Sequence, residues 1–341
     1  MAVKHPLHHF FLELTLNCNL NCLHCGSHCS RERKHGDELS KDEWKALLDH
    51  VKENFDLKDI ILEITGGEPL MNPDFFEIME YARDLGYHWG MTTNATLITK
   101  EVAEKLEKAG MREVAVSIDG LPSTHDAFRQ TPGAYDLAMR GLQNLIDRHA
   151  FGNIMVTTVV HKKNLHELED LYQILLGLDI DTWRVMSIEP MGSALMNKEY
   201  MLEGDEYRQV LDFIKAKRDL NMPVTYGCCH FLGVEYEAEV REWIYRCIAG
   251  TRVASVAADG SIGACLDIER RPETIQGNVR TDSFTEVWNN RFEIFRQPKY
   301  PKTKTCQACQ YKEFCDAGPY HSFNYDTNEP RLCMLKEIGG L

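Results

Sequence analysis

The chain of 341 residues lacks the features of a membrane-spanning or secreted protein. No apolar run approaches the roughly 18 to 20 residues that a membrane-spanning helix needs. The first nine residues, Met-Ala-Val-Lys-His-Pro-Leu-His-His, contain no apolar segment like that of a secretory signal peptide. These absences argue against an integral membrane protein and against secretion, and we expect a cytoplasmic protein.

An excess of basic residues is also absent. The chain has 38 Lys and Arg against 52 Asp and Glu, and its formal charge is -14. This balance argues against a broad phosphate-binding surface, so we expect no nucleic-acid partner. The sequence contains neither an internal repeat nor a low-complexity segment, which argues against a repeat architecture or a disordered tail.

Cysteine, in contrast, is plentiful, with 12 residues in the chain. In a reducing cytosol these are better interpreted as metal ligands than as disulfides. Cys18, Cys22 and Cys25 form a C-x3-C-x2-C loop after an apolar, strand-like segment. Three thiolates in such a loop can bind a four-iron, four-sulfur (4Fe–4S) cluster and leave its fourth iron open for chemistry. The alternative is half of a zinc site, which usually pairs two C-x2-C knuckles.

Apolar segments of strand length alternate with amphipathic helical segments through about residue 218. This alternation predicts repeated βα units and a parallel sheet, which right-handed crossovers would curl into a partial barrel. Chemistry in such barrels lies at the carboxyl ends of the strands, where the cysteine loop falls. We predict six strands, near 10–16, 58–65, 87–93, 112–118, 152–160 and 181–188, and six helices, near 40–54, 74–85, 99–109, 135–148, 164–177 and 203–218.

A second motif, Gly66-Gly67-Glu68-Pro69, follows the second predicted strand. Together with the cysteine loop it resembles the radical S-adenosylmethionine (SAM) superfamily, whose members cleave SAM to a 5′-deoxyadenosyl radical. The resemblance implies that the open iron of the cluster holds the methionyl amine and carboxylate of SAM. It also implies that residues at the other strand ends contact SAM. The SAM-binding residues expected from the resemblance are His24, Gly66, Gly67, Glu68, Pro69, Thr93, Asn94, Ser117, Asp119 and Arg129. We also expect Thr158 and Glu189 to face the same cavity, with a purely structural role as the alternative for both.

The composition changes from residue 247 onward, where cysteines dominate. Asp259-Gly260 between two apolar runs predicts a β-hairpin, which Cys247 would enter and Cys265 would leave. This part of the chain resembles the SPASM extension of radical SAM enzymes, which carries auxiliary iron–sulfur clusters. The resemblance implies one complete auxiliary 4Fe–4S cluster on four cysteines, with a zinc ribbon as the alternative. Its ligands would be Cys306, Cys309, Cys315 and Cys333.

The match to SPASM is incomplete, because Pro319 stands where the family has a further cysteine. The missing ligand belongs to a second auxiliary cluster, for which Cys247 and Cys265 remain. We therefore expect an α/β fold: a partial (β/α)6 TIM-like barrel at 1–218, a helical bridge at 219–246, and a C-terminal SPASM cap at 247–341. The expected cofactors are SAM, its 4Fe–4S cluster, one complete auxiliary cluster and a second auxiliary cluster with incomplete cysteine ligation.

SPASM enzymes chiefly modify peptides, so the resemblance implies a ribosomally made precursor peptide and an electron donor such as flavodoxin or ferredoxin as partners. Cys228 and Cys229 match no position of the auxiliary-cluster pattern. A thiol there could return a hydrogen atom to a peptide Cα radical on its opposite face. This favours a radical SAM peptide epimerase, with Cys228 or Cys229 as the hydrogen donor.

Several alternatives stay open at this point. The two thiols could instead be small buried hydrophobes or substitute ligands of the incomplete cluster. A second enzymatic interpretation is oxidative, namely thioether or carbon–carbon cross-linking of a precursor peptide, or dehydrogenation by a protein maturase. The third is a zinc-stabilised binding protein without catalysis.

Overall fold

The computed structural model describes residues 4–29, 31, 37–218, 220, 222–242 and 246–341. Within these residues, ten strands form one sheet in the order β10-β9-β8-β1-β2-β3-β4-β5-β6-β7. Strands β1 to β7 run parallel, each beside the next in sequence. Their bounds are His9–Glu13, Ile61–Thr65, His88–Thr93, Met111–Ser117, Asn153–Val160, Thr182–Ser187 and Val224–Tyr226. The α/β fold with a large parallel sheet is confirmed, and β7 is a strand that the sequence pattern did not predict.

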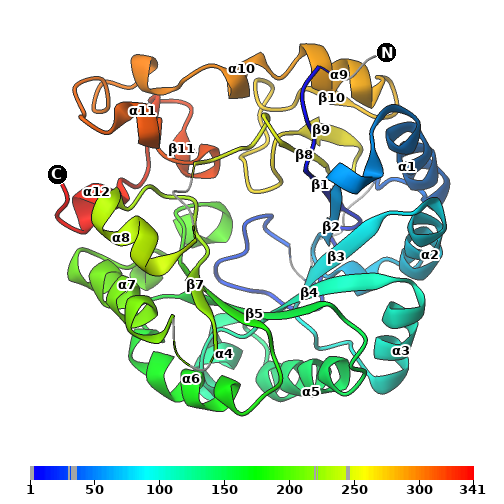
Figure 1. The fold of residues 1–341 in the computed structure, drawn as a ribbon, viewed down its shortest axis with the longest axis horizontal. Helices are drawn as coiled ribbons and strands as arrows, with labels where there is room; N and C mark the ends of the chain where they lie inside the picture. Colours follow the sequence, from blue (N-terminus) through cyan, green and yellow to red (C-terminus); the bar gives the residue numbers. More distant parts are fainter. Residues whose placement is uncertain (1–3, 30, 32–36, 219, 221, 243–245) are drawn as a thin grey trace.

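Amphipathic helices form an arc outside these strands, and the segment that follows β1 lies inside the ring (Figure 1). The capping box that begins the first helix is present, because Ser40 and Glu43 each accept from the other's backbone amide. The helices of the arc are α1 Lys41–Asn54, α2 Phe75–Leu85, α3 Lys100–Lys108, α4 Pro122–Phe128, α5 Ala134–Ile146, α6 Leu168–Leu176 and α7 Asp205–Lys217. Six of them match the predicted helices, and α4 is additional.

The C-terminal region extends the same sheet at the other edge. The predicted hairpin is present: β8 (Val253–Val256) pairs antiparallel with β9 (Ser261–Gly263), and β8 also pairs in parallel with β1. β10 (Gly277–Asn278) follows, and then α9 (Phe284–Asn290) packs beside α1. The remaining elements include α10 Glu293–Arg296, α11 Lys312–Cys315, β11 Phe323–Asn324, β12 Glu329–Pro330 and α12 Met334–Glu337.

In its described residues, the segment 219–246 contains strand β7 as well as helix α8 (Gly233–Val240), so the predicted helical bridge also includes a strand. Residue 219, the predicted boundary, lies outside the described residues. The sheet therefore continues through all three predicted segments.

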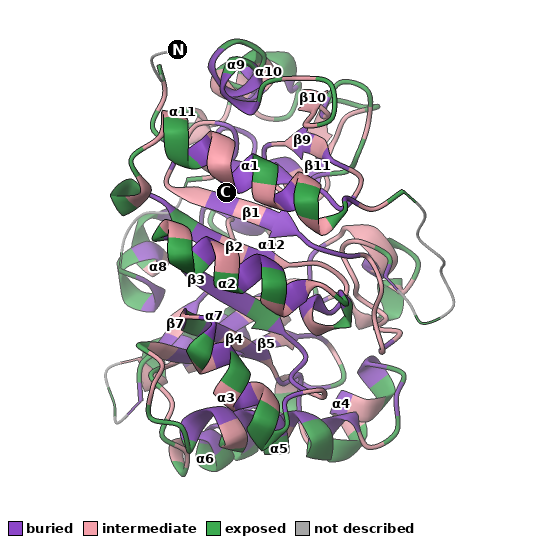
Figure 2. Cartoon of the chain, turned by 90° about the vertical axis from the view of Figure 1, so that its right-hand side faces the viewer, coloured by how far each residue is buried: buried purple, intermediate pink, exposed green. Residues whose placement is uncertain are grey.

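The two faces of the strands differ, as alternation along a strand requires. In β6, Trp183 is fully buried and contacts Tyr172 of α6 and Phe213 of α7. Its neighbour Arg184 therefore points to the opposite face, into the interior of the barrel, where its Nε donates to Thr157 at 3.2 Å. Figure 2 shows the buried layer between strands and helices.

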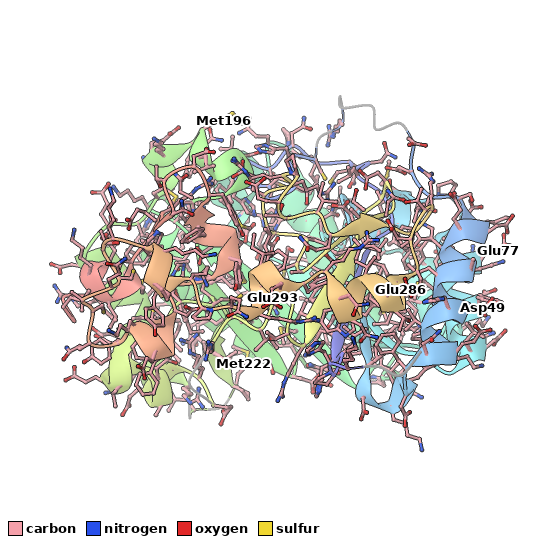
Figure 3. The ribbon with its side chains drawn as sticks, turned by 90° about the horizontal axis from the view of Figure 1, so that it is seen from above. Asp49, Glu77, Met196, Met222, Glu286 and Glu293 are labelled. Atoms are coloured by element: carbon pink, nitrogen blue, oxygen red, sulfur yellow. The ribbon has the colours of Figure 1, made fainter. Side chains whose placement is uncertain are left out.

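The outer helical surface is polar. On α2, Glu77 forms ion pairs with Lys41 and Lys45 of α1, and Asp49 of α1 lies on the same side of the molecule (Figure 3). No helix within the described part of the chain combines the length and apolar character needed to span a membrane.

Candidate active site

The cysteine loop begins directly after β1, at the carboxyl edge of the sheet. Cys18, Cys22 and Cys25 lie close enough together for their charges to interact. Each sulfur has an N–H donor: Leu20 N donates to Cys18 at 3.5 Å, Arg129 to Cys22 at 3.9 Å and Cys29 N to Cys25 at 3.2 Å. Burial raises the pKa of the free Cys18 and Cys22 thiols to about 11 and about 12.

Three convergent sulfurs with N–H donors suit a cluster that is bound by three thiolates, because N–H donors stabilise thiolate charge. The pKa of Cys25 is lowered to about 7, mainly by its hydrogen bond with the Cys29 side chain. Cys29 itself is 4% exposed, as expected of a small buried residue. The three residues fit the predicted cluster, and their role as ligands stays a prediction.

The double glycine after β2 presses against the cysteine loop. Gly67 N donates to Thr15 O at 2.7 Å, and Glu68 N donates to Asn17 O at 2.9 Å. A Cβ on Gly66 would lie 2.3 Å from Thr15 O, and one on Gly67 would lie 2.2 Å from Asn17 O. Both glycines are therefore required by the close approach of two backbone segments.

Glu68 connects this turn to the end of β3. Its carboxylate accepts from Thr93 Oγ1 at 2.8 Å and from Asn94 N at 2.9 Å. Burial raises the pKa of Glu68 to about 7, although these hydrogen bonds oppose the shift. Asn94 in turn donates to Asn19 of the cysteine loop at 3.0 Å. The structure thus brings Glu68, Thr93 and Asn94 together beside the loop, as a shared SAM site requires.

A buried ion pair lies on the other side of the loop. Arg129 Nη2 is 2.7 Å from Asp119, and both side chains are nearly inaccessible. Burial opposes ionisation of Asp119, but Arg129 and nearby histidines outweigh it and hold its pKa at about 2. His24 stacks on Phe128, with ring centroids 4.3 Å apart, and lies 3.9 Å from Asp119. Ser117 is the last residue of β4, two residues before Asp119, and its contact with SAM stays a prediction.

Thr158 does not join that group. Its hydroxyl donates to Ile118 O at 2.6 Å and accepts from Trp183 Nε1 at 2.9 Å, on the face that packs against the helices. Alternation along β5 places Thr157 and Val159 on the inner face instead. Thr158 therefore does not face the SAM cavity as expected. Its hydroxyl instead connects β5 to Ile118 and to Trp183 of β6.

The thiol pair follows β7 at the same edge of the sheet. Cys228 is 3% exposed, and its Sγ donates to Ser187 O at 3.4 Å on the helix-facing side. Cys229 is partly exposed. The segment is held by Arg241, which donates to Cys228 O at 2.6 Å and to His230 O at 2.5 Å and pairs with Glu237.

Glu189 lies in a cluster with two histidines. Its Oε2 is 2.8 Å from His230 Nε2 and 3.7 Å from His321 Nε2. Burial opposes ionisation of Glu189, but the two histidines hold its pKa well below the usual range. The expectation that Glu189 faces the SAM cavity stays a prediction. The two histidines belong to no recognisable sequence motif. The position of His230 next to Cys229 is the only feature of the sequence that could have indicated a functional role for either histidine.

The distal cysteines Cys306, Cys309, Cys315 and Cys333 interact electrostatically, and burial raises the pKa of Cys315 to about 12. These residues fit a fully ligated cluster, which stays a prediction.

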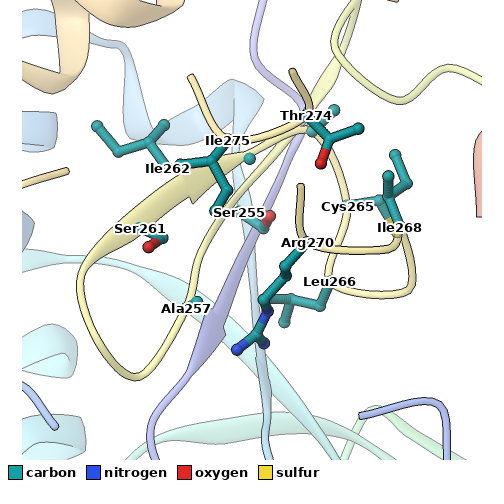
Figure 4. Close-up of a pocket in the computed structure, with 12 residues that line it drawn as sticks. Ser255, Ala257, Ser261, Ile262, Cys265, Leu266, Ile268, Arg270, Thr274 and Ile275 are labelled. Carbon is teal, nitrogen blue, oxygen red and sulfur yellow. The ribbon is translucent and has the colours of Figure 1, made fainter. Parts of the chain in front are cut away.

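Cys247 and Cys265 also interact, and the pKa of Cys265 is raised well above its usual range by burial, then by Asp267. Beside Cys265, the β8–β9 hairpin and Arg270 line a cavity of about 20 Å³ (Figure 4). No third cysteine joins this pair in the pattern, so the ligands of a second auxiliary cluster remain unassigned.

Residues 12–175 match the model of the radical SAM superfamily, and residues 247–310 match SPASM, an iron–sulfur cluster-binding domain. A relative, the AdoMet-dependent heme synthase of Nitratidesulfovibrio vulgaris, is 30% identical over 95% of this chain and 91% of its own length. The chain belongs to the radical SAM superfamily. This radical SAM enzyme carries a SPASM domain, and both domains imply iron–sulfur clusters and SAM as cofactors.

Two further relatives of this radical SAM enzyme are a second heme synthase and a maturase. The AdoMet-dependent heme synthase of Methanosarcina barkeri is 32% identical, over 89% of this chain and 88% of its own. The mycofactocin maturase MftC of Mycobacterium tuberculosis is 29% identical, over 90% of this chain and 76% of its own.

Two solved structures share the fold. Streptococcus suis SuiB bound to precursor peptide SuiA has a TM-score of 0.73 at 18% identity, and covers 94% of this chain and 73% of its own. Native anSMEcpe with bound AdoMet has a TM-score of 0.76 at 18% identity, and covers 97% of this chain and 94% of its own.

Proposed function

We propose that this radical SAM enzyme inverts a Cα centre in a ribosomally made peptide, with Cys229 as the hydrogen donor. The observation that carries the proposal is the position of the thiol pair. β1 and β7 are parallel, so the loops that follow them, with the cluster cysteines and with Cys229, lie at the same edge of the sheet. Because Cys228 is hydrogen-bonded on the helix-facing side, Cys229 is the better placed of the two.

The proposed reaction balances as follows. One electron and SAM give methionine and a 5′-deoxyadenosyl radical, which takes the Cα hydrogen and becomes 5′-deoxyadenosine. The Cys229 thiol then gives its hydrogen atom to the opposite face of the Cα radical and becomes a thiyl radical. A second electron and a proton restore the thiol. The protein positions SAM and peptide, and a flavodoxin or ferredoxin supplies both electrons.

Support for a peptide substrate comes from the SuiB complex with its precursor peptide and from the relative MftC, a maturase by name. The experiment is anaerobic incubation of the reconstituted enzyme with SAM, reductant and the peptides encoded by short reading frames beside its gene, in D2O. We expect one deuterium at Cα for each inverted residue. Loss of two hydrogens would instead identify oxidative cross-linking or dehydrogenation.

The Cys229→Ala variant tests the donor, and Cys228→Ala is its matched control. Cys229→Ala should still form 5′-deoxyadenosine and yield little inverted peptide, whereas Cys228→Ala should retain inversion. If Cys229→Ala inverts the peptide as the wild type does, the assignment fails.

A second candidate substrate is an iron porphyrin. The observation that favours it is the match to two heme synthases over 88% and 91% of their own lengths. Incubation with iron porphyrins under the same conditions tests it, because a changed porphyrin mass with formation of 5′-deoxyadenosine would displace the peptide proposal.

A further inference from the structure

Three donor side chains from distant parts of the chain converge where the barrel meets the C-terminal region. Glu189 follows β6, His230 follows β7, and His321 lies in the short helix Tyr320–Ser322. One ligand atom from each lies within 4.8 Å of the others. No other group of three or more His, Cys, Asp or Glu residues in the described part of the chain meets this criterion.

Buried polar atoms in this cluster lack hydrogen-bond partners. Glu189 Oε1 and His321 Nε2 have no hydrogen-bond partner. The hydroxyl of Tyr207, whose pKa is raised by burial and by the charge of Glu189, has none either. Glu189 is 7% exposed and Tyr207 is 2% exposed, so bulk water does not satisfy these atoms. An unsatisfied buried polar group is destabilising, and several in one place call for a ligand.

The distances suit a metal ion. Metal–nitrogen and metal–oxygen bonds of about 2.0 to 2.2 Å place neighbouring ligand atoms about 3.0 to 3.5 Å apart. The observed separations from Glu189 Oε2 are 2.8 Å to His230 and 3.7 Å to His321, so small side-chain shifts would suffice. The backbone of His230 is already fixed, because Arg241 donates to its carbonyl.

We propose that Glu189, His230 and His321 bind one divalent transition-metal ion, separate from the iron–sulfur clusters. Two imidazoles and a carboxylate are a set that zinc and ferrous iron accept, with the remaining coordination positions open to water or to a substrate oxygen. None of the three donors is a cysteine, although the Cys228 thiol interacts with Glu189, so nitrogen and oxygen ligands distinguish this site from the cluster sites. It does not depend on the proposed epimerisation.

Zinc is the probe, because the clusters contain none. The anaerobically reconstituted full-length enzyme is equilibrated with Zn2+, desalted, and analysed for zinc, iron and sulfide. We expect one more zinc ion per chain in the wild type than in His321→Gln or Glu189→Gln. The control variant His166→Gln, at an exposed position on the surface, should retain that zinc.

Zinc X-ray absorption separates this site from cysteine sites. We expect nitrogen and oxygen neighbours at about 2.0 to 2.1 Å, whereas thiolate sites would give sulfur at about 2.3 Å. A sulfur shell, or equal zinc content in the wild type and both variants, would overturn the proposal. Unchanged iron content and thermal unfolding temperature in the variants show that they fold, and Glu189→Gln keeps the shape of the side chain. The zinc measurements do not depend on the result of the peptide assay. The metal-site proposal and the epimerase proposal can therefore fail independently of each other.

Discussion

At the scale of single residues, the Gly66–Gly67 turn fixes the cysteine loop through backbone contacts. A Cβ at Gly67 would lie 2.2 Å from Asn17 O. Because Asn17 O is a backbone atom of the cysteine loop, the clash can be relieved only by moving the loop itself. We expect Gly67→Ala to displace the loop, so that the enzyme loses most of its SAM-cleaving activity. The measurement is 5′-deoxyadenosine formation together with iron and sulfide content after reconstitution.

The control for this change is Gly152→Ala. A Cβ at Gly152 would meet only Arg112 O, at 3.6 Å, which is an ordinary contact. This variant should retain activity within about twofold, since surface substitutions usually change stability by less than ~0.5 kcal/mol. Full activity in Gly67→Ala would show that the loop does not depend on the close approach.

The titration of Glu68 should make the affinity for SAM depend on pH, and the buried environment of Glu68 decides the direction. Burial raises its pKa to about 7, so the carboxyl is largely protonated at pH 6 and ionised at pH 8. If Glu68 holds the SAM amino group, SAM binds the ionised form, and affinity should rise with pH. We expect binding to weaken by up to about tenfold per pH unit below that pKa.

Equilibrium dialysis of SAM between pH 6 and pH 8 measures this effect, and Glu68→Gln is the reference. The variant keeps the size of the side chain but cannot titrate, so any slope that remains belongs to SAM itself or to other groups. Identical slopes in the wild type and the variant would remove Glu68 from the SAM site.

The sequence predicted those functional residues that lie close together in the chain and form a recognisable spacing motif. The three loop cysteines, the Gly-Gly-Glu-Pro turn and the four distal cysteines could be found this way, and within each cysteine set the side chains interact electrostatically. His230 and His321 could not, because they meet only through the packing of the C-terminal region against the barrel. Thr158 was assigned to the wrong face, since a one-residue error in the inward alternation of a strand reverses every side chain.

At the scale of elements, α8 holds the segment that carries Cys229 and His230. Arg241 donates to the carbonyls of Cys228 and His230 and pairs with Glu237 at 2.6 Å. We expect Arg241→Lys to loosen this segment, because an ammonium group cannot reproduce the fork of a guanidinium. On the proposed function, the variant should still form 5′-deoxyadenosine but yield less inverted peptide per deoxyadenosine.

The matched control is Arg83→Lys, on the exposed face of α2, where Arg83 pairs with Asp84. It should leave the ratio of inverted peptide to deoxyadenosine unchanged. A wild-type ratio in Arg241→Lys would mean that the segment needs no such support.

The long elements were predictable because their periodicity extends over many residues. Two short ones were missed for a physical reason. β7 spans only Val224–Tyr226, and α4 spans Pro122–Phe128, so both are shorter than the window over which a hydrophobic pattern can be recognised. Both gain their order from packing: β7 from pairing with β6, and α4 from contacts with α5.

At the scale of the whole molecule, the C-terminal region is part of the barrel sheet rather than an independent cap. β8 pairs with β1 along His9–Leu12, and Phe10 contacts Phe284 of α9 at 4.9 Å between ring centroids. Sequence spacing identified the hairpin but not its partner strand, because pairing between distant segments leaves no local pattern.

One buried carboxylate connects the two regions. Glu13 of β1 is fully buried, pairs with Arg270 at 2.6 Å and accepts from Ala258 N at 3.1 Å. Burial raises the pKa of Glu13, and Arg270 opposes that shift. Removing Arg270 would leave the carboxylate buried without a counter-charge. We expect Arg270→Met to lose about 3 kcal/mol of stability, the lower end for a broken buried pair, because Arg270 is partly exposed.

The loss should depend on pH in a definite direction. Without Arg270 the folded-state pKa of Glu13 rises further above its unfolded value, so the folded state holds the proton more tightly and stability falls as pH rises. Thermal unfolding of the reconstituted enzyme should therefore show a larger deficit at pH 8 than at pH 5. The double variant Glu13→Gln/Arg270→Met carries no buried charge and should recover most of the loss at pH 8. If the double variant is as unstable as Arg270→Met at both pH values, the arginine acts through packing and not through the charge of Glu13.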